Sequence, residues 1–425
     1  MEGSAAAAAP SSPSEPRDRS GAFRALRHRN YRLYFFGQLT SLAGTWMQSA
    51  AQSWLVLKLT DSSLMLGVVS FAQFLPILLV GVFAGVIVDR VDRRRMIITT
   101  QTLLMLSAFT LAALTWSGAV RVYHVIALAA FNGTIGSFDM PGRQSFVVEM
   151  VGQEDLGNAI ALNSMMFNGA RMIGPAIAGL LIAWLGTAAC FFLNGVSFLA
   201  VIWSLTQMEI PARTMAAMAP MLTQVREGLN YIWRHRPILY QMVLSAVNNG
   251  FGNQYLVLIP LFARDLLHGG ARGYGFLVAA QGLGSVVGAA TLASRVSTRG
   301  MRNNLILGLL LSGIGILAFG TSRWMWLSLL AQFVVGAGLT NFRASNNTLV
   351  QLFVSDELRG RVMSCYQLAS VGMTPLGSLE VGYLGSRLSP RIAVGICGSV
   401  TLACALALVT RLKAIGVESD ERAAS

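Results

Sequence analysis

Three ionisable side chains, Asp139, Arg171 and Glu380, lie inside long apolar stretches of this sequence. A charge at the centre of a lipid bilayer costs at least about 2.5 kcal/mol on insertion scales, so each side chain should face the protein interior. Burial favours the protonated form of a carboxyl group, which suits Asp139 or Glu380 to carrying a proton between the two sides of a membrane. Arg171 suits either attraction of an anionic substrate or a structural pair with one of these acids.

The elements that must hold these residues are membrane helices. The chain has 425 residues, of which 54% are hydrophobic and 12% charged, so it has more apolar side chains than one soluble core buries. Apolar runs of about 20 residues recur along it, and they should be helical because backbone in lipid must satisfy its own hydrogen bonds. The twelve expected spans are 31–57, 64–88, 96–116, 122–141, 157–185, 189–207, 238–262, 274–293, 303–319, 325–342, 362–385 and 392–412.

The basic residues are distributed unequally between the two sides that these spans define. The formal net charge is +13, and segments on one side hold most of the 32 Lys and Arg residues. The opposite side holds only Lys58, Arg121, Arg264, Arg272, Arg323, Arg387 and Arg391. This pattern predicts a multi-pass membrane protein with both termini in the cytoplasm, and it explains the basic excess without nucleic-acid binding. The expected location is the plasma (bacterial inner) membrane.

Two halves of the sequence resemble each other. The segment GVVSFAQ at 67–73 recurs as GFLVAAQ at 275–281, which suggests an internal duplication. Many transporters bind substrate between such halves and expose it alternately to the two sides. The expected divisions are a disordered tail (1–20), a six-helix bundle (21–207), a cytoplasmic linker with an amphipathic helix (208–237), a second bundle (238–412) and a cytoplasmic tail (413–425).

Several other classes of protein are not supported by the sequence. The only lysines, Lys58 and Lys413, both follow leucine, so the phosphate-binding loop GxxxxGK[ST] of an ATP-driven pump is absent. The zinc motif HExxH and the nucleophile motif GxSxG are also absent. We therefore expect neither an enzyme nor a bound metal or cofactor.

The charged segment GVIVDRVDRRR (residues 85–95) resembles the signature between helices 2 and 3 of the major facilitator superfamily. Its matching residues are Gly85, Asp89, Arg90, Arg93 and Arg94, whereas Asp92 replaces a glycine of the signature. Residues 138–164 and the segment NGARMIGPAIAG (168–179) are similar to the branch that contains the enterobactin exporter and macrolide efflux proteins. The resemblance covers about residues 22–412.

This resemblance implies an all-α integral membrane protein with 12 transmembrane helices in two pseudo-symmetric six-helix bundles. It implies that Asp89 helps to hold the two halves together at the cytoplasmic face, opposite the start of helix 11, whereas a stop-transfer role would need only the arginines. It also implies that Gly174, Pro175 and Gly179 bend and seal helix 5, although helix packing alone would favour the same residues. These residues form the predicted gating set, namely Gly85, Asp89, Arg90, Arg93, Arg94, Gly174, Pro175 and Gly179.

Amides and an aromatic residue without fixed charge are candidates for lining a cavity, although interhelical hydrogen bonding is the alternative. They are Gln38, Trp46, Gln48, Gln52, Asn248, Asn249, Asn253 and Asn341. The expected function is efflux of a hydrophobic or amphipathic small molecule of drug or siderophore type by a monomeric secondary transporter in contact with membrane lipids. Proton antiport is implied by relatives. Alternatives are an importer or flippase for a metabolite or lipid-like substrate, and a non-transporting receptor.

Overall fold

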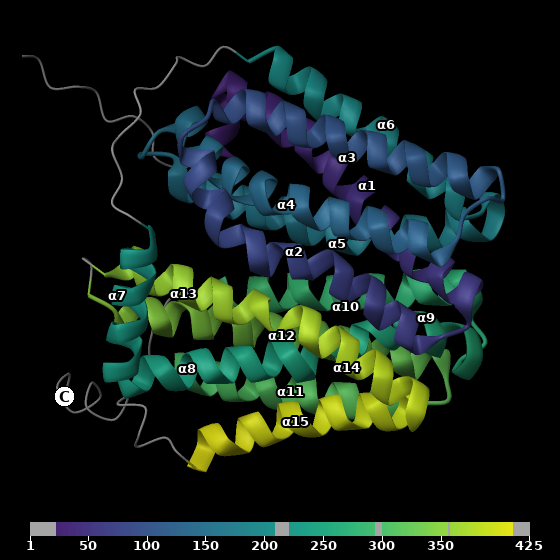
Figure 1. Ribbon diagram of the computed structural model, residues 1–425. Coiled ribbons are helices and arrows are strands. Elements are labelled where there is room, and N and C mark those ends of the chain that lie inside the picture. Colours follow the sequence, from purple (N-terminus) through teal and green to yellow (C-terminus); the bar gives the residue numbers. More distant parts are fainter. Residues whose placement is uncertain (1–22, 209–220, 294–299, 356–357, 411–425) are drawn as a thin grey trace, which may run out of the picture.

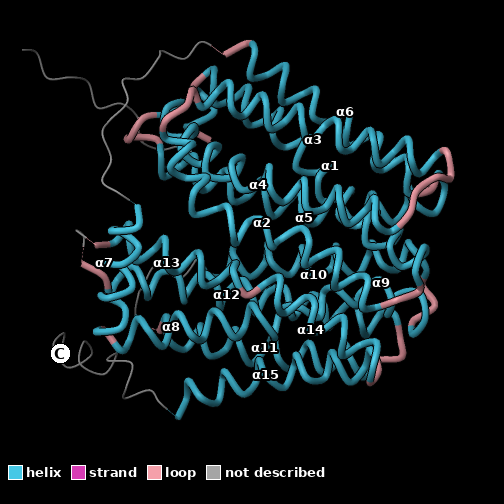
Figure 2. The backbone as a smooth tube through the Cα atoms, in the orientation of Figure 1, coloured by secondary structure: helices cyan, strands magenta, loops and turns pink. Residues whose placement is uncertain are grey.

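The computed structural model describes residues 23–208, 221–293, 300–355 and 358–410. These residues form helices joined by short links, and no strand occurs among them, which confirms the all-α prediction (Figures 1 and 2). The predicted tails, 1–20 and 413–425, lie outside the described residues.

The first half of the chain forms six long helices after a short 3-10 turn, η1 (Arg24–Arg27). They are α1 (Arg29–Thr60), α2 (Ser63–Asp89), α3 (Arg93–Trp116), α4 (Val122–Val151), α5 (Leu156–Leu185) and α6 (Thr187–Thr206). The amphipathic helix expected in the linker is α7 (Met221–Arg234).

The second half contains both continuous and interrupted helices. They are α8 (Arg236–Val247), η2 (Asn248–Gly252), η3 (Asn253–Leu258), α9 (Ile259–Leu261), η4 (Phe262–Leu266), α10 (Gly270–Ala293), α11 (Met301–Thr321), α12 (Met325–Phe353), α13 (Arg359–Gly372), α14 (Thr374–Arg387) and α15 (Pro390–Thr410). In the described part of the chain, eight helices are long and apolar enough to cross a membrane, namely α2, α3, α5, α6, α10, α11, α12 and α15.

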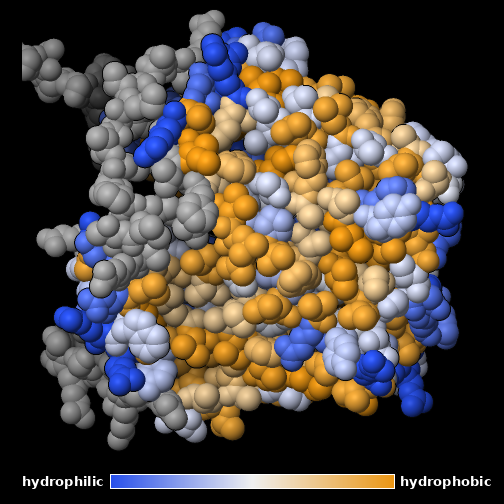
Figure 3. Space-filling view, viewed as in Figure 1, coloured by the Kyte–Doolittle hydropathy of each residue, from blue (hydrophilic) through white to orange (hydrophobic). Residues whose placement is uncertain are grey.

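The helices lie side by side in two groups, α1 to α6 and α8 to α15, with α7 across one end of the second group (Figure 1). We call the end where α1 begins the basic end, because Arg24, Arg93 to Arg95 and Arg361 lie there, and the end where α1 finishes the distal end. Apolar side chains cover the middle of the face in Figure 3, and hydrophilic ones gather toward the two ends. This distribution is that of a protein whose middle lies in lipid.

Two close contacts between glycines join the halves toward the distal end. A Cβ atom on Gly67 of α2 would lie 3.2 Å from the Cα of Gly382 of α14. A Cβ atom on Gly179 of α5 would likewise lie 3.0 Å from the Cα of Gly275 of α10. Any larger side chain would separate these backbones, so the glycine contacts set how closely the halves approach.

Polar groups add to this closure at the distal end. The hydroxyl of Ser63 donates to the carbonyl of Gly382 over 3.1 Å, and Arg264 forms an ion pair with Asp61 across the two halves. Trp54 stacks on Tyr274 with ring centroids 6.0 Å apart. The halves are therefore packed tightly at this end.

The internal repeat is also present in the packing. A Cβ atom on Gly133 of α4 would lie 1.9 Å from the carbonyl oxygen of Gln73, and one on Gly336 of α12 would lie 1.9 Å from that of Gln281. Gln73 and Gln281 end the two repeated segments identified in the sequence. Each half thus brings its second and fourth long helical segments into backbone contact at equivalent positions.

Two of the expected helices, 238–262 and 362–385, are interrupted. The first passes through a π-helical turn at Asn248–Gly252 and a 3-10 segment at Asn253–Leu258. The second breaks at Met373, just before Pro375, whose nitrogen has no hydrogen to donate. The breaks touch each other, because a Cβ atom on Gly377 would overlap the carbonyl of Gly250. The first segment stays helical through these turns, and only its pattern of backbone hydrogen bonds changes locally.

Substitution of Gly179 tests the glycine contact. In Gly179→Ala the new methyl would lie 2.8 Å from the carbonyl oxygen of Ala271, and overpacking of this size costs about 1–3 kcal/mol. We expect the distal end to open in a larger fraction of molecules. Spin labels at the exposed positions Leu59 and Trp324 should report a longer distance.

Gly169→Ala on the same helix is the matched control, because nothing lies within 4 Å of its added methyl. The four native cysteines are buried and should not react with the label. An unchanged distance distribution in Gly179→Ala would show that this contact does not hold the distal end closed.

Candidate substrate cavity

A cavity of about 640 Å³ lies between the two halves, within the range of about 300–1,000 Å³ that small-molecule sites occupy. Its lining comes from α1, α2, α4 and α5 of the first half and from the interrupted helices, α10 and α12 of the second. Amides line it at Gln52, Gln73, Asn249, Asn253, Gln254, Gln281, Asn347 and Gln367, and aromatic rings at Trp46, Phe74, Phe167, Tyr274 and Tyr366. Such a mixture suits an amphipathic molecule.

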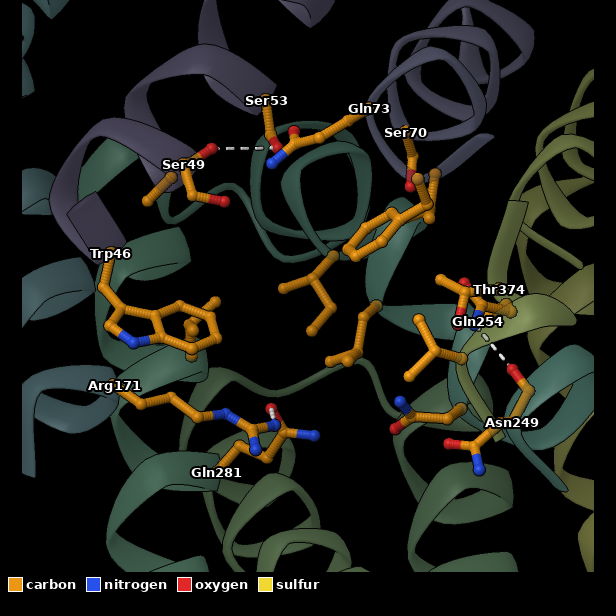
Figure 4. A pocket seen from close by; sticks show the side chains of 18 of the residues that line it. Trp46, Ser49, Ser53, Ser70, Gln73, Arg171, Asn249, Gln254, Gln281 and Thr374 are labelled. Atoms are coloured by element: carbon orange, nitrogen blue, oxygen red, sulfur yellow. Dashed lines mark hydrogen bonds between the residues drawn. The ribbon is translucent and has the colours of Figure 1, made fainter. Parts of the chain in front are cut away.

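Arg171 of α5 lies at one side of this cavity, beside Trp46 and Gln281 (Figure 4). Its Nη2 donates to Oε1 of Gln281 over 3.3 Å, and its Cζ lies 5.7 Å from the centroid of the Trp46 ring. The structural pairing with Asp139 or Glu380 considered from the sequence does not occur. The guanidinium of Arg171 is instead held by an amide of the other half and by an aromatic face.

Arg343 of α12 also lines the cavity, and the sequence analysis did not single it out. Its Nη2 donates to Oδ1 of Asn249 over 3.2 Å. The apolar run ends at residue 342, so hydropathy placed Arg343 in a loop, but the helix continues to Phe353. Asn346 and Asn347 follow within one turn, and such a run of amides was the available signal for a helix that lines a polar cavity.

The predicted cavity residues divide evenly. Trp46, Gln52, Asn249 and Asn253 line this cavity. Gln38, Gln48, Asn248 and Asn341 do not. Gln48 accepts a hydrogen bond of 2.7 Å from Asn194 of α6, and Asn341 donates to Ala337 of its own helix over 3.1 Å. Gln38 and Asn248 are 1% and 0% exposed. Gln48 therefore forms a hydrogen bond between two helices, which was the alternative to lining a cavity.

Asp139 belongs to a buried network between α3 and α4. Its carboxylate is 6% exposed, accepts hydrogen bonds from the Thr100 hydroxyl at 2.7 Å and the Gln101 amide at 2.8 Å, and forms an ion pair with Arg143. This acid is therefore fully partnered and does not line the cavity.

Glu380 of α14 has a different environment. It is partly exposed, and it has no hydrogen-bond or ion-pair partner among the residues that the structure describes. Of the three ionisable residues first identified, Glu380 is thus the acid whose protonation would break no existing bond.

The charged segment 85–95 joins the ends of several helices of the first half. Arg93 pairs with Glu149 of α4, and Arg94 donates to the carbonyls of Leu205 and Thr206 over 2.8 and 2.9 Å. Cationic side chains stabilise helix C-termini in this way, here that of α6.

Asp92, which replaces a glycine of the family signature, has a structural role. It is the N-cap of α3, and its Oδ1 accepts a hydrogen bond of 3.0 Å from the backbone of Arg95. Arg90 is exposed at the end of α2. The surroundings of Gly85 and the side chain of Asp89 lie outside what the structure describes.

The predicted gating residues of α5 lie in two different contacts. A Cβ atom on Gly174 would lie 2.7 Å from the Ala43 carbonyl of α1, so Gly174 packs within the first half. Gly179 packs against the second half, as described above. Pro175 lies between them and lines the cavity.

Comparison with known proteins places this architecture in a family. The family described as transmembrane secretion effector matches residues 20–425. The chain belongs to that family, within the major facilitator superfamily. The chain is 26% identical to the staphyloferrin A transporter of Staphylococcus aureus, covering 81% of this chain and 87% of the relative. It is 26% identical to the multidrug efflux pump Tap of Mycolicibacterium fortuitum, covering 83% and 88%.

Solved structures share the fold at lower identity. The nucleoside transporter NupG superposes with a TM-score of 0.70 at 12% identity, covering 91% of this chain and 99% of that chain. A bacterial homologue of the iron transporter ferroportin, in an inward-facing state, gives 0.69 at 15% identity, covering 90% and 98%. These relatives are membrane transporters rather than enzymes, as the sequence predicted.

Asp139→Asn tests the buried network. The change leaves the Arg143 guanidinium without a counter-charge, and breaking a buried pair costs about 3–5 kcal/mol. We expect a lower free energy of unfolding in detergent micelles, measured by denaturant titration.

Addition of Arg143→Gln should recover part of this loss, because the double variant buries no unpaired charge. Glu154→Gln, at an exposed acid of the α4–α5 link, is the control. Unchanged stability in Asp139→Asn would contradict a structural role for this carboxylate.

Proposed function

We propose that this protein exports an amphipathic small molecule by alternating access. The observation that carries the proposal is the cavity between the two halves, which combines amide and aromatic lining with tight closure at the distal end. A site between two pseudo-symmetric halves is exposed to either side by rocking of one half against the other. The substrate would enter from the basic end and leave through the distal end once the glycine contacts separate.

The direction follows from the proposed topology. The eight apolar helices of the described chain are long enough to span the bilayer. Twelve crossings result if α1, α4 and the two interrupted helices, 236–266 and 359–387, span it as well. The ends of the described chain then lie on one side. The arginines of the basic end support its location in the cytoplasm.

Two named relatives support the substrate class. One is described as a staphyloferrin A transporter and the other as a multidrug efflux pump. We propose a substrate of drug or siderophore type on this basis.

Gating would use both ends of the molecule. At the distal end, Gly179 and its partner Gly275 must part when the cavity opens there. At the basic end, Asp89, the last residue of α2, would approach the start of α13 when the molecule is open at the distal end and closed at the basic end. Gly85, Arg90, Arg93 and Arg94 would hold this loop in place.

We propose that proton coupling, if the gradient drives export, involves Glu380 rather than Asp139. A coupling group must gain and lose its proton in each cycle. Protonation of Asp139 would weaken its pair with Arg143, whereas Glu380 has no such partner among the described residues. The position of Glu380 on an interrupted helix supports a link between its charge and helix movement.

An accumulation assay tests export. Bacteria that lack their major efflux pumps and express this chain should accumulate less of at least one of a panel of dyes, antibiotics and siderophores. Collapse of the proton gradient should restore accumulation. Increased accumulation on expression would instead identify an importer, and no change with any compound would contradict the proposal.

Glu380→Gln tests proton coupling separately from substrate movement. In proteoliposomes, uptake driven by a pH gradient should fall to the level of vesicles without a gradient, whereas exchange of substrate at equal concentrations should persist. Glu154→Gln is the control, because that side chain is exposed in a link between helices. Unchanged gradient-driven uptake would exclude Glu380 as the coupling group.

A further inference from the structure

The cavity contains two positive charges and no negative one. Arg171 and Arg343 are the charged side chains among the described residues that line it, and neither Asp nor Glu belongs to that lining. The other polar groups are neutral amides, hydroxyls and the indole of Trp46. The two guanidinium charges repel each other.

The contacts that hold the two arginines do not neutralise them. Arg171 donates one hydrogen bond to Gln281, and Arg343 donates one to Asn249. A guanidinium has five N–H donors, so most donors of each remain for a ligand. Neither arginine has an acidic partner among the described residues. An unpaired charge away from bulk water is unfavourable, so a bound anion would relieve a cost that the empty cavity carries.

Hydrogen-bonded chains fix the position of each arginine. The amide of Gln281 that accepts from Arg171 donates in turn to the hydroxyl of Tyr255 over 3.1 Å. The amide of Asn249 that accepts from Arg343 donates to the carbonyl of Ser245 over 3.0 Å. Both guanidinium groups are therefore held in place before a ligand arrives, which lowers the entropic cost of binding.

Aromatic side chains lie in the same cavity. Trp46 lies beside Arg171, and Phe74, Phe167 and Tyr274 contribute further apolar surface. A ligand that satisfies the whole lining thus needs an apolar, preferably planar body and an anionic group.

Resting on the proposed export function, we propose that the substrate is an amphipathic organic anion whose carboxylate binds between Arg171 and Arg343. Guanidinium groups bind carboxylates through paired hydrogen bonds, a geometry that matches both groups. One arginine belongs to each half of the protein. A carboxylate that contacts both would therefore favour approach of the halves around the ligand, so that binding of the anion promotes closure of the cavity.

A pair of dyes with the same ring system tests the charge preference. Fluorescein carries a carboxylate and a net negative charge, whereas rhodamine 6G has the same xanthene ring, an esterified carboxyl group and a positive charge. Binding is measured by dye anisotropy with the purified full-length protein in an uncharged detergent. We expect fluorescein to bind more tightly than rhodamine 6G.

Substitutions then assign the preference to the arginines. Arg171→Gln and Arg343→Gln should each weaken fluorescein binding by about tenfold to a hundredfold and should not weaken rhodamine 6G binding. Arg171→Lys keeps the charge and should retain part of the preference. Arg272→Gln is the matched control, because Arg272 also lies over a tryptophan ring, Trp184, at 5.9 Å, but outside the cavity.

The outcomes separate this inference from export itself. Rhodamine 6G binding as tightly as fluorescein, or equal loss of both dyes in the glutamine variants, would overturn the inference while leaving export intact. Arginine-dependent fluorescein binding supports the inference even if no compound is exported from cells. If gel filtration shows that either Arg171→Gln or Arg343→Gln is unfolded, the remaining variant tests the same carboxylate site.

Discussion

Direct backbone contact between the two halves is the constraint on which the rest of this structure depends. Helices in lipid gain no hydrophobic energy by associating, so they must rely on close packing, and close packing requires the absence of side chains where they cross. Gly67 with Gly382 and Gly179 with Gly275 meet this requirement at the distal end. Nearer the middle of the molecule, a cavity lies between the halves.

The interrupted helices are the second determinant of the cavity. The π-helical and 3-10 turns of the first one carry Asn249, Asn253 and Gln254, which line the cavity. These amides also hold Arg343 through Asn249. The same segment therefore supplies neutral lining and positions a charge, which one straight helix would not do as readily.

The helices could be predicted from the sequence more fully than the site could. Long apolar runs correctly predicted an all-helical protein, and eight helices of the described chain are long and apolar enough to cross a membrane, because hydropathy reports exposure to lipid. Hydropathy placed Arg343 outside the membrane, because it does not distinguish a polar residue that faces a cavity from one that faces bulk water. It also missed the breaks before Asn248 and Pro375, which depend on contact between distant segments. The N-cap role of Asp92 was not predicted, because this residue was compared only with the glycine of the family signature.

The positions of the two cavity arginines also bear on the history of the protein. Gly133 in the first half makes the same contact as Gly336 in the second, and Gly179 the same as Gly382. When the halves are aligned by these glycines, Arg171 aligns with Thr374, and Met140 aligns with Arg343. All four of these side chains line the cavity, yet each pair contains one cation and one neutral residue. Two copies of one gene begin identical, so this difference arose after duplication. The glycine contacts at the distal end are thus repeated in both halves, whereas the charges that line the cavity are not.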